Sequence, residues 1–289
     1  TPDRSLNTKT STDNNVTEIT GGTTSGSNLF HSFRDFSVGT GSTAYFNNGT
    51  DISNIIGRVT GDSISNIDGL LRANGEANLI LINPNGISFG NNARLDLGGS
   101  FLGSTANSIL FEDGSVFNTD LNSQPLLTIS APVGLQLGQE SGGIKVSGTG
   151  DLTSGLSIST GQIFALVGNG ITFDGGVVTA PSGRIELGSV SQGQVSIQQI
   201  AAGWQLGYEG VTQFGDLQLL NRSALLNPNL VANSTGGIQV QGSKIFLERS
   251  QIAAQTQANA TGGDIVVNGS ESLTLSGTTA VAANSSLIS

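Results

Sequence analysis

The chain has 289 residues, among them 42 Gly, 6 Pro and 11 Lys or Arg, and its formal net charge is −10. This length is enough to bury a core. The few basic residues do not cluster, so the sequence offers no electrostatic surface for nucleic acid or for an anionic membrane. The absence of Cys excludes a disulfide scaffold, a thiolate metal site and a Cys nucleophile.

The first 60 residues read as a polar arm followed by an aromatic cap. Residues 1–27 are rich in Thr, Ser, Asn and Gly, with one short strand predicted at 16–19. Residues 28–60 concentrate aromatic side chains, which a stack of β-strands needs at its open end. The predicted cap residues are Phe30, His31, Phe33, Phe36, Phe46 and Asn47. We interpret the lone His31 as a packed cap residue and not as a catalytic base.

From residue 61 onward, short apolar strands alternate with turns. Strands are predicted at 63–67, 79–82, 87–89 and 93–97, each bounded by Asn, Gly or Asp. No segment shows a sustained helical period with caps. No apolar run reaches the roughly 18 residues that a membrane helix needs, so no membrane insertion is expected.

A loose repeat recurs along this region. Gly242-Ser-Lys-Ile-Phe-Leu-Glu is followed by Gly262-Gly-Asp-Ile-Val-Val-Asn, which places Ile245 and Ile265 20 positions apart. Similar strands begin earlier at separations of 19 and 22 positions, at Ile144, Ile163 and Ile185. A repeat of this length with about two short strands per lap indicates a β-solenoid. We expect its coils to occupy residues 61–230 and to continue through 231–289 as the start of a longer shaft.

Residues 197–230 interrupt the repeat. They hold the only Trp of the chain and one of its two Tyr residues, in the group Trp204, Tyr208 and Phe214. We interpret the segment near 197–225 as a hairpin that packs outside the coils.

Asn83-Pro-Asn-Gly-Ile lies between two predicted strands and favours a tight turn. Pro84 presets φ at the second turn position, Asn85 tolerates a positive φ at the third, and Gly86 takes the fourth. Ile87 then returns to the core. A stable corner of a coil explains this motif without any further role.

The order of several motifs resembles a known family. These are Asn28-Leu-Phe-His-Ser-Phe-Arg-Asp-Phe, Phe46-Asn-Asn, Ser65-Asn-Ile-Asp-Gly-Leu-Leu, Asn83-Pro-Asn-Gly-Ile-Ser-Phe-Gly and Gly98-Gly-Ser-Phe-Leu. Across most of residues 20–220 the sequence resembles the filamentous-haemagglutinin N-terminal domain. This is the secretion domain of two-partner secretion exoproteins in bacteria with an outer membrane.

The resemblance implies a right-handed parallel β-helix with an N-terminal β cap and extra-helical strands. It also implies export through the periplasm and recognition by an outer-membrane β-barrel transporter with periplasmic polypeptide-binding modules. The recognition motif then falls on Asn83, Pro84, Asn85, Gly86 and Ile87. The family commonly has a second motif, Asn-Pro-Asn-Leu, before this one. Here Asn227-Pro-Asn-Leu follows it, and we interpret it as an unrelated turn, with Phe46-Asn-Asn-Gly as the candidate for the earlier position.

Two further expectations concern the start of the chain and the role of the full-length exoprotein. The chain begins at Thr1 and contains no Met, which is typical of a start from which a signal peptide has been removed. The full-length exoprotein is expected outside the cell or at its surface, where it could bind a host or surface ligand as an adhesin, act as a toxin or form a matrix.

The alternative is a β-helical protein that binds or cleaves carbohydrate. Cleavage would need clustered carboxylates on one face. Candidates such as Asp62 with Asp68, or Asp174 with Glu186, show no recurring register. One His and no Cys disfavour a zinc site, and no phosphate-binding loop is present, so neither an enzyme nor a cofactor is expected.

Overall fold

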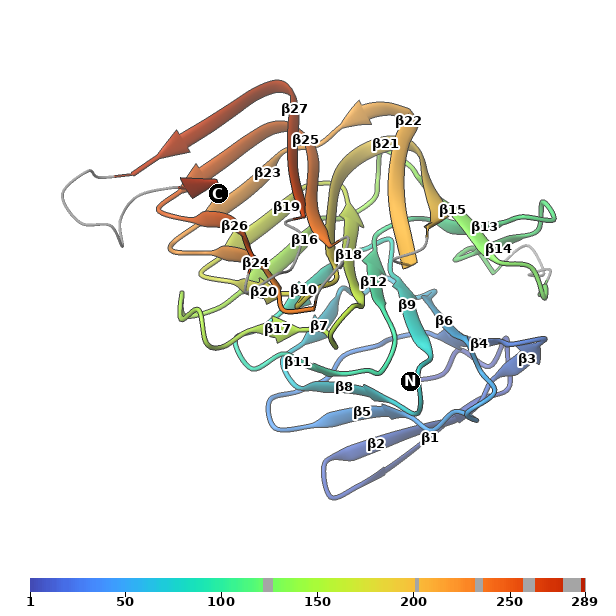
Figure 1. The fold of residues 1–289 in the computed structure, drawn as a ribbon. Helices are drawn as coiled ribbons and strands as arrows, with labels where there is room; N and C mark the ends of the chain where they lie inside the picture. The colour runs from blue at the N-terminus through green and yellow to red at the C-terminus, as the bar shows by residue number, and fades with distance from the viewer. Residues whose placement is uncertain (122–126, 201–202, 232–235, 257–262, 278–286, 289) are drawn as a thin grey trace.

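The protein is described by a computed structural model that covers residues 1–121, 127–200, 203–231, 236–256, 263–277 and 287–288. In these ranges the regular structure is entirely β, and most strand pairs are parallel. The strands wind into stacked coils with three faces (Figure 1). The predicted all-β parallel β-helix is confirmed.

The first face carries the longest run of parallel strands. Its strands in stacking order are β4 (Asn28–Phe33), β6 (Asn54–Val59), β9 (Asn78–Ile82), β12 (Phe101–Ser104), β18 (Ile163–Gly168), β21 (Arg184–Ile200), β25 (Gly237–Glu248) and β27 (Asp264–Ser276).

The second face uses shorter strands. They are β7 (Ser65–Ile67), β10 (Ile87–Phe89), β16 (Ile144–Ser147), β19 (Ile171–Asp174) and β23 (Leu217–Leu220), followed by the second halves of β25 and β27.

The third face has two parts. The first contains β5 (Thr43–Phe46), β8 (Leu70–Ala73) and β11 (Arg94–Asp96). The second contains β17 (Leu156–Ser157), β20 (Val177–Thr179), β24 (Ala224–Asn229), β26 (Gln251–Thr256) and β28 (Leu287–Ile288).

The predicted period of about 20 residues fits some coils, such as the one in which Phe164 pairs with Ile185, 21 positions later, but the last coils are longer. Ile265 pairs with Ile238, which lies 27 positions earlier, and Ile245 pairs with Leu273. Ile144 pairs with Ile171 on the second face, whereas Ile163 lies on the first face. Each coil holds three short strands of similar composition, so the separations from Ile144 to Ile163 and from Ile245 to Ile265 compared different faces of the helix.

The N-terminal end is closed by a hairpin. β1 (Thr8–Asp13) and β2 (Val16–Gly21) pair antiparallel, and β2 continues the third face by pairing with β5. The strand predicted at 16–19 lies within β2. β3 (Thr23–Ser25) turns back antiparallel onto β4 and leads the chain into the first coil.

Two insertions leave the helix and join into one extra-helical sheet. The first contains β13 (Ser108–Phe111), β14 (Val116–Asn118) and β15 (Pro132–Leu137), which the sequence analysis did not anticipate. The second is the hairpin of β21 and β22 (Gly203–Phe214), which begins at Val190 and not near 197. Gly134 pairs with Ser196, so the two insertions share one sheet beside the helix (Figure 1).

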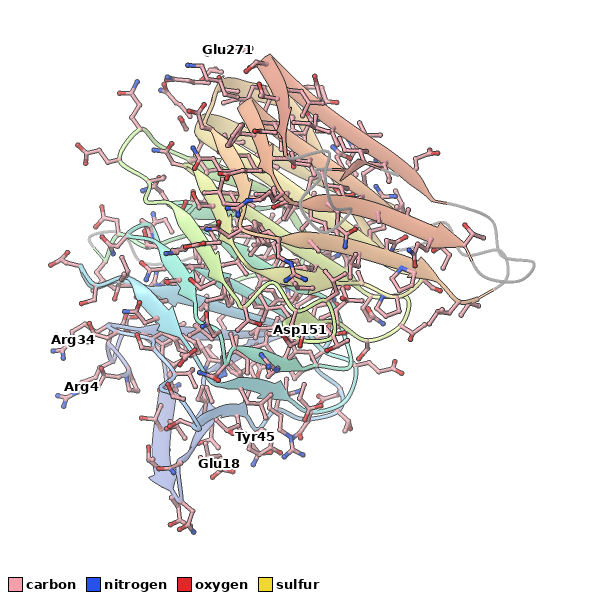
Figure 2. The ribbon with its side chains drawn as sticks, turned by 90° about the vertical axis from the view of Figure 1, so that its left-hand side faces the viewer. Arg4, Glu18, Arg34, Tyr45, Asp151 and Glu271 are labelled. Atoms are coloured by element: carbon pink, nitrogen blue, oxygen red, sulfur yellow. The ribbon has the colours of Figure 1, made fainter. Side chains whose placement is uncertain are left out.

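The insertions explain why some strands are apolar on both faces. In β9, Leu79 and Leu81 point into the helix, and Ile80 and Ile82 pack under the extra-helical sheet. All four are fully buried. Alternating side chains of a strand reach opposite faces, so a strand covered on both sides becomes continuously apolar. Charged side chains such as Arg34 and Glu271 project from the outside (Figure 2).

An asparagine ladder ties the first coils together. Asn54 donates from Nδ2 to Asn28 Oδ1, and Asn78 donates to Asn54 Oδ1, each at 2.9 Å. The backbone N–H of Ser100 donates to Asn78 Oδ1, also at 2.9 Å. The same position in successive coils thus satisfies its polar groups with its neighbours, which fixes the register of four coils.

Candidate partner-recognition site

The Asn83-Pro-Asn-Gly-Ile motif forms the predicted turn between β9 and β10. The backbone N–H of Gly86 donates to the Asn83 carbonyl at 3.1 Å. The positive φ of this turn is at Gly86 (+127°) and not at Asn85, so that detail of the prediction is wrong. A Cβ at Gly86 would lie 3.0 Å from the Gly143 carbonyl oxygen, because the next coil packs directly against the turn.

The Asn83 side chain is fully buried, and both its Nδ2 and its Oδ1 make hydrogen bonds. Its Nδ2 donates to the Ser63 carbonyl at 3.0 Å and to Ser65 Oγ at 2.9 Å. Its Oδ1 accepts from the backbone N–H of Asn85 at 3.0 Å. Asn83 therefore joins its own turn to the coil before it, and no part of its amide faces solvent.

The remaining motif residues link the turn to coils on both sides. Asn85 donates from Nδ2 to the Gly61 carbonyl at 2.6 Å. The backbone N–H of Gly142 donates to the Pro84 carbonyl at 2.6 Å, and that of Ile87 donates to the Gly143 carbonyl at 3.2 Å. The hydrogen bonds of the motif therefore connect three successive coils. Only Pro84 and Asn85 are half-buried; the others are buried.

Asn227-Pro-Asn-Leu, interpreted above as a turn, is mostly strand. Asn227, Pro228 and Asn229 lie in β24, and Pro228 pairs with Gln255 of β26. The Asn227 side chain is fully buried and donates to the Ala180 and Gly183 carbonyls at 2.6 and 2.8 Å. The same tripeptide thus lies in a turn in one coil and in a strand in another; Gly86, with its positive φ, follows it in the turn, and Leu230 follows it after the strand.

Four of the predicted cap residues, three Phe and one His, form one aromatic cluster at the capped end of the helix. The ring of Phe33 lies 5.0 Å from Phe36 and 6.4 Å from Phe46. His31 lies 5.6 Å from Phe46, and its Nδ1 is 3.2 Å from Thr8 Oγ1 of β1. Burial lowers the pKa of His31 to about 4, so the imidazole is neutral.

The other two cap residues lie apart from this cluster. Phe30 points to the opposite face of β4, with its ring 5.1 Å from Phe117 under the extra-helical sheet. Asn47 is exposed and donates to Glu18 Oε1 at 2.6 Å. Alternation along β4 separates Phe30 from Phe33, which sequence proximity had grouped together.

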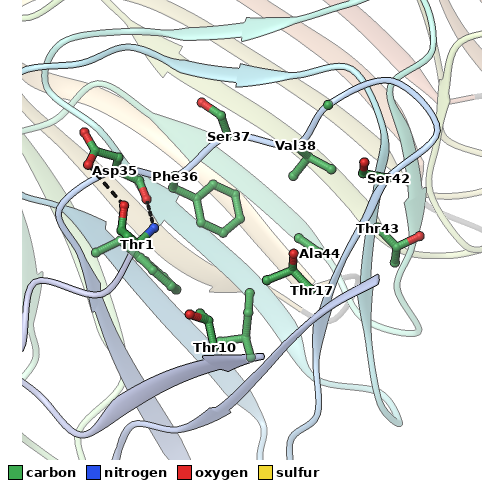
Figure 3. Close-up of a pocket in the computed structure, with 13 residues that line it drawn as sticks. Thr1, Thr10, Thr17, Asp35, Phe36, Ser37, Val38, Ser42, Thr43 and Ala44 are labelled. Atoms are coloured by element: carbon green, nitrogen blue, oxygen red, sulfur yellow. Dashed lines mark hydrogen bonds between the residues drawn. The ribbon is translucent and has the colours of Figure 1, made fainter. Parts of the chain in front are cut away.

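A small cavity lies under the cap hairpin (Figure 3). It has a volume of 160 Å³, with Thr10 and Thr17 of the hairpin on one side and Phe36 on the other. Thr1 closes one end, where its amino group donates to the Asp35 carbonyl at 2.6 Å. The cavity is too small for a polymer, and its place under the hairpin makes it a packing gap of the cap.

The three extra-helical aromatic residues belong to one hydrophobic cluster but differ in burial. Trp204 is buried in the core between the helix and the extra-helical sheet. Tyr208 and Phe214 are half-buried at its edge, with ring centroids 6.1 Å apart. Burial, with a smaller contribution from Glu186, raises the pKa of Tyr208 well above its ordinary value.

The sequence analysis missed Arg58, the largest fully buried side chain. It lies on the outer face of β6, where Nε donates to Ser32 Oγ at 2.8 Å and its guanidinium carbon is 4.7 Å from the Phe117 ring centre. It also donates to the Asn118 carbonyl. A lone Arg in an apolar strand is the only signal that the sequence carries for this role.

Among the described residues, the carboxylates do not gather into a catalytic arrangement. Asp174 is 3.6 Å from Lys145, while Glu186 is fully buried and 2.7 Å from Arg184. Within the described ranges, no group of three or more His, Cys, Asp or Glu residues is placed to hold a metal ion. We also find there no helix with the length and hydropathy that crossing a bilayer requires.

Comparisons with known proteins identify the family. A family model described as the TPS secretion domain matches residues 1–240, where TPS denotes two-partner secretion. Among solved structures, the crystal structure of the HMW1 secretion domain from Haemophilus influenzae has 16% sequence identity and a TM-score of 0.46, covering 91% of this chain and 82% of that one. No curated protein sequence matches. Because the family match spans most of the chain, this protein belongs to the TPS secretion domain family and is the secretion domain of a two-partner secretion exoprotein.

Proposed function

We propose that a cognate outer-membrane β-barrel transporter recognises this domain while the chain is extended, and that its folding outside the cell nucleates the β-helix of the exoprotein. The observation that carries this proposal is the burial of Asn83. In the folded domain the preceding coil engages the Nδ2 of its amide, and the backbone of its own turn engages the Oδ1. A partner that reads this residue must therefore meet it before the coils form.

An extended chain also offers what a transporter can bind. The strands that later pair with each other carry free backbone groups in the unfolded chain. Periplasmic polypeptide-binding modules could pair with these groups by adding a strand to a sheet edge. The turn motif would then mark one segment among many similar strands, because its Pro and Gly set it apart from the Ile- and Val-rich strands around it.

Outside the cell, the cap and the first coils give later coils a template. Each coil buries its apolar face against the preceding one, so folding proceeds from the N-terminus. Parallel pairing continues beyond residue 240 through β27, which supports an adhesin-like shaft after the secretion domain. We place the product in the medium or at the surface of a bacterium with an outer membrane, where the full-length exoprotein could bind a host or surface ligand, and we expect no catalytic activity.

A secretion assay with a matched control tests transporter recognition. Asn83→Ala and Asn227→Ala each remove one fully buried amide that is bonded to a neighbouring coil. Each is expected to cost about 1–3 kcal/mol of folding stability, measured by urea denaturation. If Asn83 has a recognition role, transporter-dependent export falls about tenfold or more for Asn83→Ala and much less for Asn227→Ala.

Parallel losses would contradict this proposal. If export follows folding stability equally in both variants, Asn83 acts only as a structural residue. Export without any transporter would also reject recognition by the barrel. Asn85→Ala removes the hydrogen bond to the Gly61 carbonyl and tests the role of the same turn in export with a second substitution.

A further inference from the structure

A polar groove of 440 Å³ runs along the outside of the helix, between β22 and the outer faces of β25 and β27. Side-chain amides dominate it. They belong to Gln198, Gln205, Gln239, Gln241 and Asn268, and Glu209 is its one carboxylate among the described lining residues. The groove lies far along the chain from the turn motif, and the transporter proposal does not use it.

The groove forms where the β22 hairpin ends and the outward faces of the next coils begin. Gly188 of β21 pairs with Gln241, and Gln241 pairs with Asn268, so these positions stack on the outward face of three coils. The β22 hairpin covers Gly188. Tyr208 lies so close to this glycine that a Cβ added there would be only 2.6 Å from the Tyr208 hydroxyl oxygen. Gln239 and Gln241 of the next coil are each 9% exposed, and Asn268 of the coil after it is exposed, so these amides form the floor of the groove beside the hairpin.

Most of these amides have unused hydrogen-bonding capacity. Gln239 donates from Nε2 to the Leu206 carbonyl at 3.2 Å. Among the described residues, the side chains of Gln198, Gln205, Gln241 and Asn268 make no hydrogen bond. Each carboxamide offers two donors and one acceptor. The groove therefore presents several donor and acceptor sites side by side.

Charge and aromatic content restrict the ligand. No Lys, Arg or His is among the described residues that line the groove, Glu209 lies in it, and the chain carries a net charge of −10. An anionic ligand would be repelled. Tyr208 and Phe214 contribute a half-buried aromatic pair at one wall. The matching ligand is neutral, rich in hydroxyl groups and apolar on one face.

We propose that this groove binds a neutral oligosaccharide. Adjacent sugar hydroxyls can donate to and accept from one carboxamide, and the C–H face of a sugar ring can pack on the aromatic pair.

A peptide strand fits the groove less well. β22 is an edge strand, but Gln239 occupies the Leu206 carbonyl, and the pairing of β21 with β22 shifts register at three places. Irregular and capped edges disfavour strand addition.

The test measures binding of neutral hexasaccharides of glucose, mannose and galactose to the complete 289-residue chain. Isothermal titration gives the affinity, and the side-chain NH₂ signals of a ¹⁵N-labelled sample report which amides are contacted. Gln241→Ala and Asn268→Ala are expected to weaken binding of at least one hexasaccharide about tenfold. Gln218→Ala, an exposed outward Gln on β23, is the matched control and should leave the affinity unchanged.

Three binding results would overturn the proposal. They are the absence of saturable binding to all three hexasaccharides, equal affinity in the groove variants and the wild type, and a preference for a sulfated heparin hexasaccharide. Transporter-dependent export of Gln241→Ala should equal that of the wild type. A loss of export with no change in sugar binding would assign the groove to a protein partner instead and would also reject the proposal.

Discussion

At the scale of single residues, the buried His31 couples the cap to pH. It is 1% exposed, between the aromatic cluster and Thr8 of the cap hairpin. Its pKa is lowered from 6.5 to about 4 because burial disfavours the imidazolium. The unfolded chain therefore binds this proton at a higher pH than the folded domain does.

We expect the cap to lose stability as the pH falls. For a base whose folded pKa is lowered, the stability is fully present above 6.5 and declines as the pH falls towards 4. The difference between these pKa values corresponds to about 3 kcal/mol. Urea midpoints measured across this range should fall for the wild type and fall less for His31→Gln, which keeps a polar partner for Thr8.

Glu186 changes folding stability with pH in the opposite direction to His31, so the two contributions must be measured separately. Burial raises its pKa from 4.5 to about 6, so its contribution is fully present below 4.5 and is lost as the pH rises through 6. Glu186→Gln removes this contribution and should steepen the acid loss that His31 causes. Identical pH profiles for the wild type and His31→Gln would show that His31 is not the group responsible.

At the scale of elements, Arg58 fastens two segments to the first coils. Besides Ser32 and the Asn118 carbonyl, it donates from Nη2 to Ser5 Oγ at 3.1 Å. Asp3 accepts from Ser32 Oγ at 2.5 Å and so extends the network into the N-terminal segment. One side chain of β6 thereby holds both the arm that precedes the cap and the hairpin of β13 and β14.

Arg58→Met should release both segments together. We expect a loss of about 3 kcal/mol, because several buried polar groups lose their partner. Hydrogen exchange should accelerate at residues 3–6 and 108–118 while the later coils stay protected. Arg72→Met is the control: Arg72 is an exposed residue 3.3 Å from Asp96, and its loss should change stability by less than about 0.5 kcal/mol. Unchanged exchange in both segments would contradict this role of Arg58.

At the scale of the whole molecule, stability passes from coil to coil. Ile245 is 1% exposed and pairs with Leu217 of the preceding coil and Leu273 of the next. The interior of the helix is one continuous apolar cluster from the cap to the last coils. A defect in one coil therefore removes the template for the coils that follow.

Ile245→Asp should stop export after the coils that precede β25 have reached the outside. A buried unpaired carboxylate costs several kcal/mol, on the order of 3–5, so folding should stop near this coil and no longer draw the chain outward. In a transport assay, residues before β25 should reach the outside and the later coils should lag. Gln218→Asp, which places the same charge on an exposed position of β23, should be exported normally. Normal export of Ile245→Asp would reject folding as a driving force.

The amino-acid sequence by itself determined the local structure and the family. Gly, Asn and Pro between short apolar strands fix turns and strands over a few residues, so β7, β9 and β10 and the Asn83 turn were predictable. The order of these motifs was enough to suggest the secretion-domain family, and the family model matches residues 1–240.

Only the tertiary structure decided which strands face each other and what covers them. Coil length, the strand at Asn227, the separation of Phe30 from Phe33, and the role of Arg58 all depend on residues distant in sequence. Arg58 meets Asn118 across 60 positions, and the amide groove combines a hairpin with two later coils. Local propensity carries no information on such partners, because strands of similar composition compete equally well until three-dimensional packing selects one register.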